Sequence, residues 1–225
     1  MRRVAVYAGT RNIYLNRATA AKSLLCHTRM DRVWFLIEDD AFPEPLPEVI
    51  KTKNVSGQKW FDPDGPNARK RWSYMALMKL ALPEVFPEEE RLLWLDVDTV
   101  VNKDIGDLFE TDLGENLVAA AEEPMRSRRP FMYFNAGVLL MDTKKLAAAV
   151  PSLVKMANGH PMDFPDQDAI NLCLQGRIRP INPTYNSNYW IVEVPDPHIT
   201  HYAAERQYEN HELWQQYEKS DWRVL

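Results

Sequence analysis

The chain opens with the strand-like run Val4-Ala5-Val6-Tyr7-Ala8, and Arg32-Val33-Trp34-Phe35-Leu36-Ile37 follows as a second run of the same kind. Between them, an Ala- and Leu-rich segment from about Tyr14 to Cys26 has helical spacing, with Lys22 on its outer side. A strand, a helix and a strand at this spacing form a βαβ unit, which pairs its strands in parallel. We therefore expect an α/β fold with a central, mostly parallel sheet flanked by helices.

The same alternation continues along the chain. It predicts strands over 49–55, 91–95, 117–121 and 134–141, and helices over 72–82, 144–158 and 167–174, with a helical tail from Ala203. Pro83 should end the first of these helices and Gly159 the second. In such a Rossmann-like sheet, ligands bind beyond the carboxyl ends of the strands, so polar residues at these ends are the candidates for function.

Composition is consistent with one domain without linkers or repeats: 225 residues, 45% of them hydrophobic. A formal net charge of -5 disfavours general nucleic-acid binding but leaves a local basic patch open. No apolar run approaches the roughly 20 residues that cross a membrane, and Met1-Arg2-Arg3-Val4 lacks the apolar region of a signal peptide. We expect a cytoplasmic protein whose two cysteines, Cys26 and Cys173, are buried thiols.

An acidic pair, Asp96 and Asp98, directly follows the apolar run Leu92-Leu93-Trp94-Leu95. Alternate residues of an extended chain point the same way, so both carboxylates can converge at the ligand-binding edge of the sheet. A divalent cation would relieve their repulsion and could hold a diphosphate. Alternatively, these side chains only cap a turn at the end of the strand.

Two further segments set polar residues beside apolar elements. Asn135 and Gly137 lie in a strand-like run, where a glycine indicates either close approach of a ligand or another backbone, or a β-bulge. Asp166, Gln167 and Asp168 open a helix, where capping of the helix is the alternative to a functional role.

Taken together, the motifs resemble those of the family 8 retaining glycosyltransferases, which include bacterial lipopolysaccharide glucosyl- and galactosyltransferases and the glycogenins. The resemblance covers residues 4–202 and rests on four segments in order: Leu95-Asp96-Val97-Asp98, Thr111-Asp112-Leu113-Gly114-Glu115-Asn116, Phe134-Asn135-Ala136-Gly137 and Asp166-Gln167-Asp168. It implies a GT-A fold and transfer of a hexose, glucose or galactose, from a UDP-sugar with retention. It also implies a nucleotide-binding half over 1–110, a sugar and acceptor half over 111–202 and a helical tail over 203–225.

The resemblance also assigns roles. Asp96, Asp98 and His201 match the family's ligands to Mn²⁺, with Mg²⁺ as the alternative ion and His198 as the fallback ligand. Asp166 and Gln167 match the residues that face the reacting sugar. Because Gln167 is a neutral amide and a poor nucleophile, we expect same-face attack rather than double displacement. The remaining positions that match donor-binding residues are Ala8, Thr10, Asn12, Lys79, Asp96, Glu123, Asn135 and Ala136. For Lys79, a solvated lysine on a helix is the alternative.

The chain departs from the family at two places. Thr10 stands where relatives carry an acid in the nucleotide loop, which weakens the inference of a uracil base. The stretch after His201 lacks the family's diphosphate-binding Lys, and Arg206 is the candidate replacement.

Two basic runs, Arg69-Lys70-Arg71-Trp72 and Arg126-Ser127-Arg128-Arg129, are either solvated loops or part of a surface for an anionic acceptor. Arg126, Arg128 and Arg129 are the candidates on the acceptor side, and a glycan, a lipid-linked group or a nucleic acid would each suit them. Two other functions stay open: a nucleotidyltransferase, and a module that binds sugar nucleotides without catalysis. The sequence does not indicate the oligomeric state.

Overall fold

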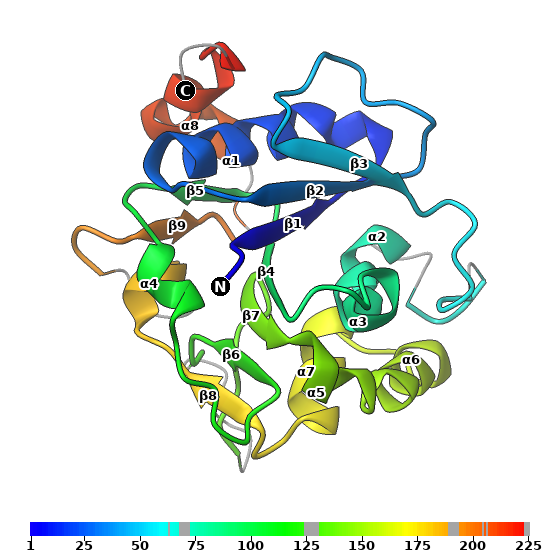
Figure 1. Cartoon of the computed structure of the whole chain (residues 1–225). Coiled ribbons are helices and arrows are strands. Elements are labelled where there is room, and N and C mark those ends of the chain that lie inside the picture. Colours follow the sequence, from blue (N-terminus) through cyan, green and yellow to red (C-terminus); the bar gives the residue numbers. More distant parts are fainter. Residues whose placement is uncertain are drawn as a thin grey trace.

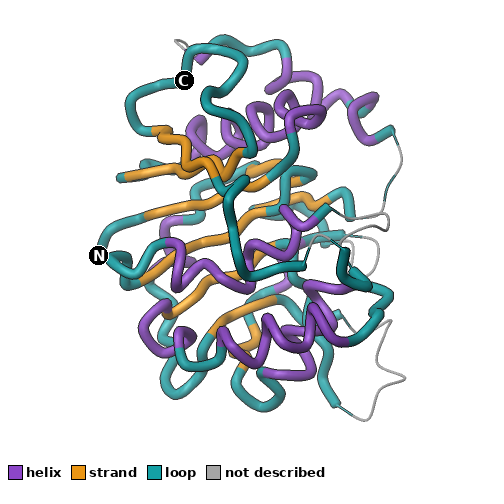
Figure 2. The backbone as a smooth tube through the Cα atoms, turned by 90° about the vertical axis from the view of Figure 1, so that its right-hand side faces the viewer, coloured by secondary structure: helices purple, strands orange, loops and turns teal. Residues whose placement is uncertain are grey.

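The computed structural model describes residues 1–62, 64–67, 73–123, 131–188, 194–203, 205 and 207–222. Its centre is a seven-stranded sheet in the order β3-β2-β1-β4-β7-β6-β8 (Figures 1 and 2). The strands are β1 (Val4–Ala8), β2 (Arg32–Ile37), β3 (Ile50–Asn54), β4 (Arg91–Leu95), β6 (Val118–Ala120), β7 (Val138–Asp142) and β8 (Ile178–Pro180). This confirms the α/β class expected from the first βαβ unit.

The sheet is mostly parallel, with one reversed strand. β1 pairs in parallel with β2 and β4, β2 with β3, and β6 with β8, whereas β7 runs antiparallel to both β4 and β6. The start of β7 therefore lies at the same edge as the carboxyl end of β4. That arrangement brings the residues before Val138 beside those after Leu95.

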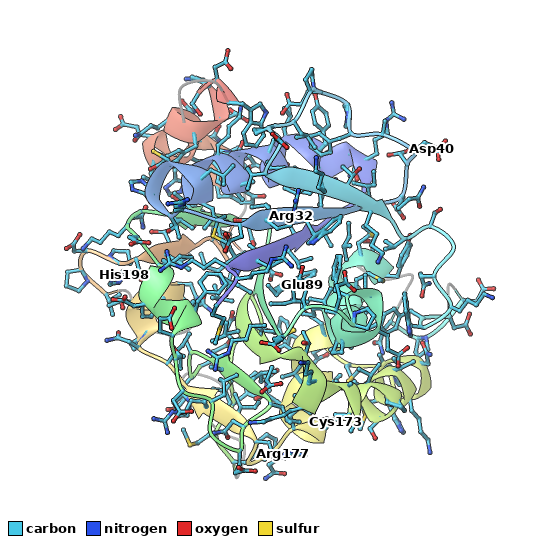
Figure 3. The ribbon with its side chains drawn as sticks, in the orientation of Figure 1. Arg32, Asp40, Glu89, Cys173, Arg177 and His198 are labelled. Carbon is cyan, nitrogen blue, oxygen red and sulfur yellow. The ribbon has the colours of Figure 1, made fainter. Side chains whose placement is uncertain are left out.

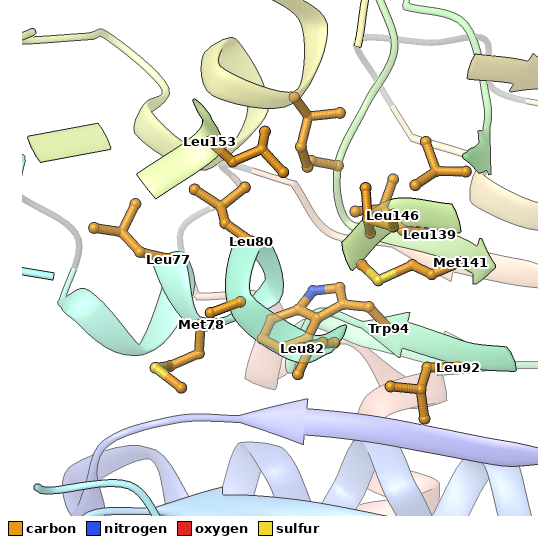
Figure 4. Packing of buried hydrophobic residues seen from close by; sticks show 14 of the residues in the cluster. Leu77, Met78, Leu80, Leu82, Leu92, Trp94, Leu139, Met141, Leu146 and Leu153 are labelled. Atoms are coloured by element: carbon orange, nitrogen blue, oxygen red, sulfur yellow. The ribbon is translucent and has the colours of Figure 1, made fainter. Parts of the chain in front are cut away.

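Both faces of the sheet are covered, and alternate side chains of β1 enter different cores. Val4 and Val6 pack in one apolar cluster, and Ala5 and Tyr7 pack in the other. Figure 4 shows the first cluster, where Trp94 of β4 lies among Leu82, Leu92 and Met141. A strand buried on both faces requires the near-continuous apolar runs that the sequence shows.

Helices complete the two layers (Figure 1). They are α1 (Tyr14–His27), α2 (Tyr74–Leu77), α3 (Leu82–Val85), α4 (Gly106–Phe109), α5 (Thr143–Ala147), α6 (Val150–Gly159), α7 (Pro165–Cys173) and α8 (Glu212–Glu218). Short 3₁₀ turns cover Arg11–Ile13, Met78–Ala81, Pro183–Asn186 and Tyr208–Asn210. A second sheet pairs β5 (Thr99–Val101) with β9 (Ile199–His201) in antiparallel.

Proline accounts for two of the boundaries that differ from the sequence prediction. Pro83 does not end a helix but sits in the first turn of α3, where its missing N–H costs nothing. The predicted helix over 144–158 is split into α5 and α6, and Pro151 occupies the first turn of α6. The predicted strand over 134–141 begins only at Val138.

The tail folds back over α1, as Figure 1 shows for α8. Trp214 and Tyr217 are buried, and Tyr217 shares a hydrogen bond of 2.8 Å with the imidazole of His27. Lys22 was expected on the outer side of α1 but is buried, because its ammonium donates to the Glu218 carbonyl and lies over the Trp222 ring.

The prediction of two buried thiols is wrong. Cys26 is exposed, and Cys173, labelled in Figure 3, is half-buried near the end of α7. Helical apolar spacing around a cysteine does not fix which way the thiol points once neighbouring elements pack. Within the described ranges, no helix combines the length and apolar character needed to cross a membrane.

Candidate functional site

The acidic pair and His201 meet at the carboxyl edge of the sheet. Asp96 and Asp98 follow β4, and β5 follows them directly; β9 pairs with β5 so that Thr99 lies opposite His201. His201 Nε2 lies 3.3 Å from Asp98 Oδ1 and 3.9 Å from Asp96 Oδ2. One potential ligand atom from each residue falls within 4.8 Å of the others. The imidazole therefore points at both carboxylates, as a three-ligand cation site requires.

Backbone and side-chain hydrogen bonds hold the two acids in place. The Asp96 N–H donates to the Gly137 carbonyl at 2.8 Å, and Asp96 Oδ1 accepts from Trp94 Nε1 at 2.7 Å. The Asp98 carbonyl accepts from the Tyr202 N–H at 2.9 Å. The Asp98 carboxylate itself is directed at the His201 ring.

Gly137 provides the space for the imidazole. A Cβ atom added at this position would lie 2.0 Å from His201 Cε1 and 2.7 Å from Nδ1, closer than side chains tolerate. Close approach therefore accounts for this glycine, but the approaching group is the ring of His201 and not the ligand or backbone expected from the sequence.

Lys79 is buried beneath the acids with its ammonium in contact with three oxygens. It donates to Asp96 Oδ1 at 3.0 Å and to the Ala136 carbonyl at 3.0 Å, and it forms an ion pair with Asp166. Desolvation acts to lower the pKa of Lys79, but the two carboxylates outweigh it and raise the pKa above its ordinary value. The ammonium therefore stays charged and links the acidic pair to the start of α7.

The carboxylates of the pair differ in their electrostatics. Desolvation raises the pKa of Asp96, and the neighbouring Asp98 charge adds to that rise. Desolvation also acts to raise the pKa of Asp98, but the imidazole of His201 outweighs it and holds this pKa below its usual range. The pKa of His201 is raised, because the two acids overcome the effect of its burial. Two carboxylates and one imidazole are a donor set that suits a divalent cation such as Mn²⁺, and we conclude that these residues fit one.

A network of buried amides extends from His201 to Gln167. Asn135 Nδ2 and Gln167 Nε2 both donate to Glu123 Oε2, at 2.9 and 3.1 Å. Gln167 Oε1 accepts from the Ala136 N–H at 3.0 Å. Asn186, which the sequence analysis missed, connects Asn135 to His201. It lies in a proline-broken stretch, and nothing in the local pattern marks it as part of a site.

Asp168 takes the structural role that was the alternative for this segment. Its Oδ2 accepts from the Phe164 N–H at 3.1 Å, at the start of α7, and its Oδ1 accepts from the Tyr133 hydroxyl at 2.7 Å. Asp166 and Gln167, by contrast, turn towards Lys79 and the amide network.

The loop after β1 lies at the same edge of the sheet. Ala8 ends the strand, and the side chains of Thr10 and Asn12 hydrogen-bond to each other. Buried Arg17, which the sequence analysis also missed, donates to the Thr10 carbonyl at 3.2 Å and to the Leu36 carbonyl at 2.5 Å. The guanidinium of Arg17 thus holds the loop in place.

Some candidates are not brought to the site. His198, the fallback ligand, stacks on Tyr185 at a centroid distance of 4.6 Å and does not join the acidic pair; Figure 3 labels it. The basic candidates Arg126, Arg128, Arg129 and Arg206, and the run from Arg69 to Trp72, lie outside the described residues.

Comparison with known proteins identifies the family. A model of glycosyl transferase family 8 matches residues 6–212. The chain belongs to glycosyl transferase family 8. Among its relatives, this family 8 chain is 26% identical over 260 residues to the glycosyltransferase GlyE of Streptococcus pneumoniae, covering 100% of the chain and 63% of GlyE. It is 32% identical over 117 residues to the lipopolysaccharide 1,2-glucosyltransferase of Escherichia coli, covering 45% of the chain and 35% of that protein.

Solved structures of the family share the fold. The crystal structure of GlyE matches with a TM-score of 0.76 at 23% identity, over 100% of this chain and 62% of that one. The galactosyltransferase LgtC, solved with donor and acceptor sugar analogues, matches with a TM-score of 0.72 at 20% identity, over 96% and 95% of the two chains. The chain thus has the GT-A fold, and it spans less than two thirds of the length of GlyE.

Proposed function

We propose that this family 8 chain is a retaining hexosyltransferase that takes glucose or galactose from a UDP-sugar with the help of Mn²⁺. The observation that carries the proposal is the convergence of Asp96, Asp98 and His201, whose ligand atoms lie within 4.8 Å of one another. The names of two relatives support the sugar: one is a lipopolysaccharide glucosyltransferase and the other a galactosyltransferase. The amide network beside the acids would supply the polar groups that a sugar requires.

In this proposal the chain's residues divide the work of binding the donor. Asp96, Asp98 and His201 hold the cation, which when bound neutralises charge on the departing diphosphate. Ala8, Thr10 and Asn12 line the nucleoside at the end of β1. Asn135, Ala136 and Glu123 line the sugar, and Lys79 fixes the position of Asp96 and Asp166 from below.

The surroundings of Gln167 and Asp166 favour same-face attack. Both polar atoms of the Gln167 side chain already have partners, the Ala136 N–H and the Glu123 carboxylate. Asp166 is paired with the Lys79 ammonium, which lowers its nucleophilicity. We infer that Asp166 binds sugar hydroxyls, and that the acceptor attacks from the face that the diphosphate leaves. A covalent sugar trapped on Asp166 or Gln167 would overturn this step.

The acceptor is the second part of the proposal. Arg126, Arg128 and Arg129 form a compact basic run in an acidic protein, and we infer that they bind an anionic glycan or lipid-linked acceptor. Arg206 is proposed to contact the diphosphate in place of the family's Lys. Replacing Arg126, Arg128 and Arg129 by Ala should abolish transfer to such an acceptor while donor hydrolysis persists. Unchanged transfer would contradict the acceptor assignment.

The donor assignment is tested by hydrolysis. The purified chain should release UDP and free sugar from UDP-glucose or UDP-galactose with Mn²⁺ and lose this activity in EDTA. Asp98→Asn and His201→Ala should each lower kcat by about 10²–10³, whereas Glu90→Gln, at an exposed pair with Lys144, should not. Binding of UDP-sugar without turnover would indicate a binding module. Release of pyrophosphate from a nucleoside triphosphate would indicate a nucleotidyltransferase.

A further inference from the structure

A continuous row of buried side chains leads from the backbone of Gly137 to the imidazole of His201. The Gly137 N–H donates to Asn135 Oδ1 at 2.9 Å, and Asn186 Nδ2 donates to the same oxygen at 2.9 Å. On its other side, Asn186 Oδ1 lies 2.8 Å from His201 Nδ1 and accepts from Asn188 Nδ2 at 3.2 Å. Asn186 is fully buried, and His201 is only 4% exposed.

The direction of every hydrogen bond in this row follows from its first member. A backbone N–H can only donate, so the Asn135 atom that faces Gly137 must be the oxygen. That oxygen can only accept, so Asn186 must present its NH₂ group to it and its carbonyl to His201. The carbonyl accepts only, and His201 Nδ1 must therefore carry the hydrogen.

We propose that Asn186 is a positioning residue, whose carbonyl holds the hydrogen on His201 Nδ1 and leaves Nε2 as the nitrogen that binds a divalent cation. The inference rests on the proposed metal site. Nε2 is the ring nitrogen that faces the acids, 3.3 Å from Asp98 Oδ1. Asn186 also prevents the ring from turning over, since a flipped ring would set a carbon against its carbonyl. A histidine ligand orients in this way when its second nitrogen has a fixed partner.

The same row links the cation site to the proposed sugar site. Asn135 Nδ2 donates to Glu123 Oε2, to which Gln167 Nε2 also donates. A change at Asn186 can therefore also reach the residues around the sugar, through Asn135. Asn186→Asp keeps an acceptor for His201 Nδ1 but turns an oxygen towards Asn135 Oδ1. Asn186→Leu removes the acceptor itself.

These two variants separate the effect on His201 from the effect on the rest of the network. Mn²⁺ affinity is measured without nucleotide, from the electron paramagnetic resonance signal of the free ion. We expect Asn186→Leu to weaken Mn²⁺ binding by about 10- to 100-fold, and Asn186→Asp to stay within a few-fold of the native protein. Asn67→Leu is the matched control, because Asn67 is also a buried amide and donates to the Ala157 and His160 carbonyls, which do not belong to the row.

A spectroscopic measurement distinguishes positioning from a loss of stability. Electron spin-echo modulation of bound Mn²⁺ detects a directly coordinated imidazole nitrogen, and it reports only on the protein that holds the ion. The native protein and Asn186→Asp should show this modulation, and Asn186→Leu should lose it. Asn67→Leu should keep both the modulation and the affinity, whatever its effect on thermal stability.

Two results would overturn the inference while the metal site survives. One is native affinity and native modulation in Asn186→Leu. The other is an equal loss of affinity in Asn186→Leu and Asn186→Asp, which would mean that acceptance from Nδ1 is not what matters. If the native protein binds no Mn²⁺, or if His201→Ala binds it as tightly as the native protein, the proposed metal site itself fails.

Discussion

The contact between Gly137 and His201 gives the sharpest test of the site. In Gly137→Ala the new Cβ would lie 2.0 Å from His201 Cε1, whereas ordinary contact begins at 3.4 Å. The ring must therefore retreat by at least about 1.4 Å from a position that is only 4% exposed. Overpacking of this kind costs about 1–3 kcal/mol of unfolding free energy, and a displacement near 1 Å at a reacting centre costs about 10²-fold in rate.

Both costs are measurable on the same protein preparation. Urea unfolding gives the change in stability, and Mn²⁺ titration with hydrolysis of the UDP-sugar gives the effect on the site. Gly159→Ala is the matched control, since a Cβ there meets no atom within 4 Å, and it should leave Mn²⁺ binding and hydrolysis at native values. Our account of the site is refuted if Gly137→Ala retains Mn²⁺ affinity and hydrolysis within twofold of the native protein.

Burial and charge also predict the outcome of two substitutions and one labelling experiment. Lys79→Met removes the ammonium that pairs with the partly exposed carboxylates of Asp96 and Asp166. We therefore expect the free energy of unfolding, measured in urea, to fall by about 1–3 kcal/mol, less than the loss of about 3–5 kcal/mol for a fully buried pair. Native stability together with native hydrolysis would contradict this role of Lys79. Trp214→Ala leaves a cavity where the fully buried indole of α8 packs, and it should lower the free energy of unfolding by about 3–5 kcal/mol. This loss is measured as a lower Tm, and an unchanged Tm would mean that the tail does not pack as described. Burial raises the pKa of the Cys173 thiol, so Cys173 has less thiolate below that pKa, and peptide mapping after brief alkylation at pH 8 should find exposed Cys26 labelled first; faster labelling of Cys173 would disprove it.

The elements in the first half of the chain were predictable because their patterns are local. β1, β2 and β4 are apolar runs bounded by polar turns, and the helix between β1 and β2 has regular spacing. Two boundaries failed at a proline: Pro83 was expected to end a helix and Pro151 to lie inside one, but each occupies the first turn of a new helix. A periodic pattern alone does not show where a proline begins a new helix.

The candidate metal ligands differ in what made them predictable. The order of residues along β4 places Asp96 and Asp98 on one edge of the sheet, because side chains of an extended chain alternate. The choice of His201 over His198 came from a family resemblance, and the pairing of β9 with β5 is what puts its ring opposite the acids. No spacing along the chain encodes that pairing.

By itself, then, the sequence determined the sheet, the acidic pair at its edge and the family to which the chain belongs. Only the tertiary structure showed that Gly137 makes room for an imidazole, that Lys79 joins Asp96 to Asp166, and that Asn186 holds His201. The physical reason is that strand and helix patterns repeat over a few residues. A buried polar group instead finds its partner wherever the packed elements bring one within about 3 Å.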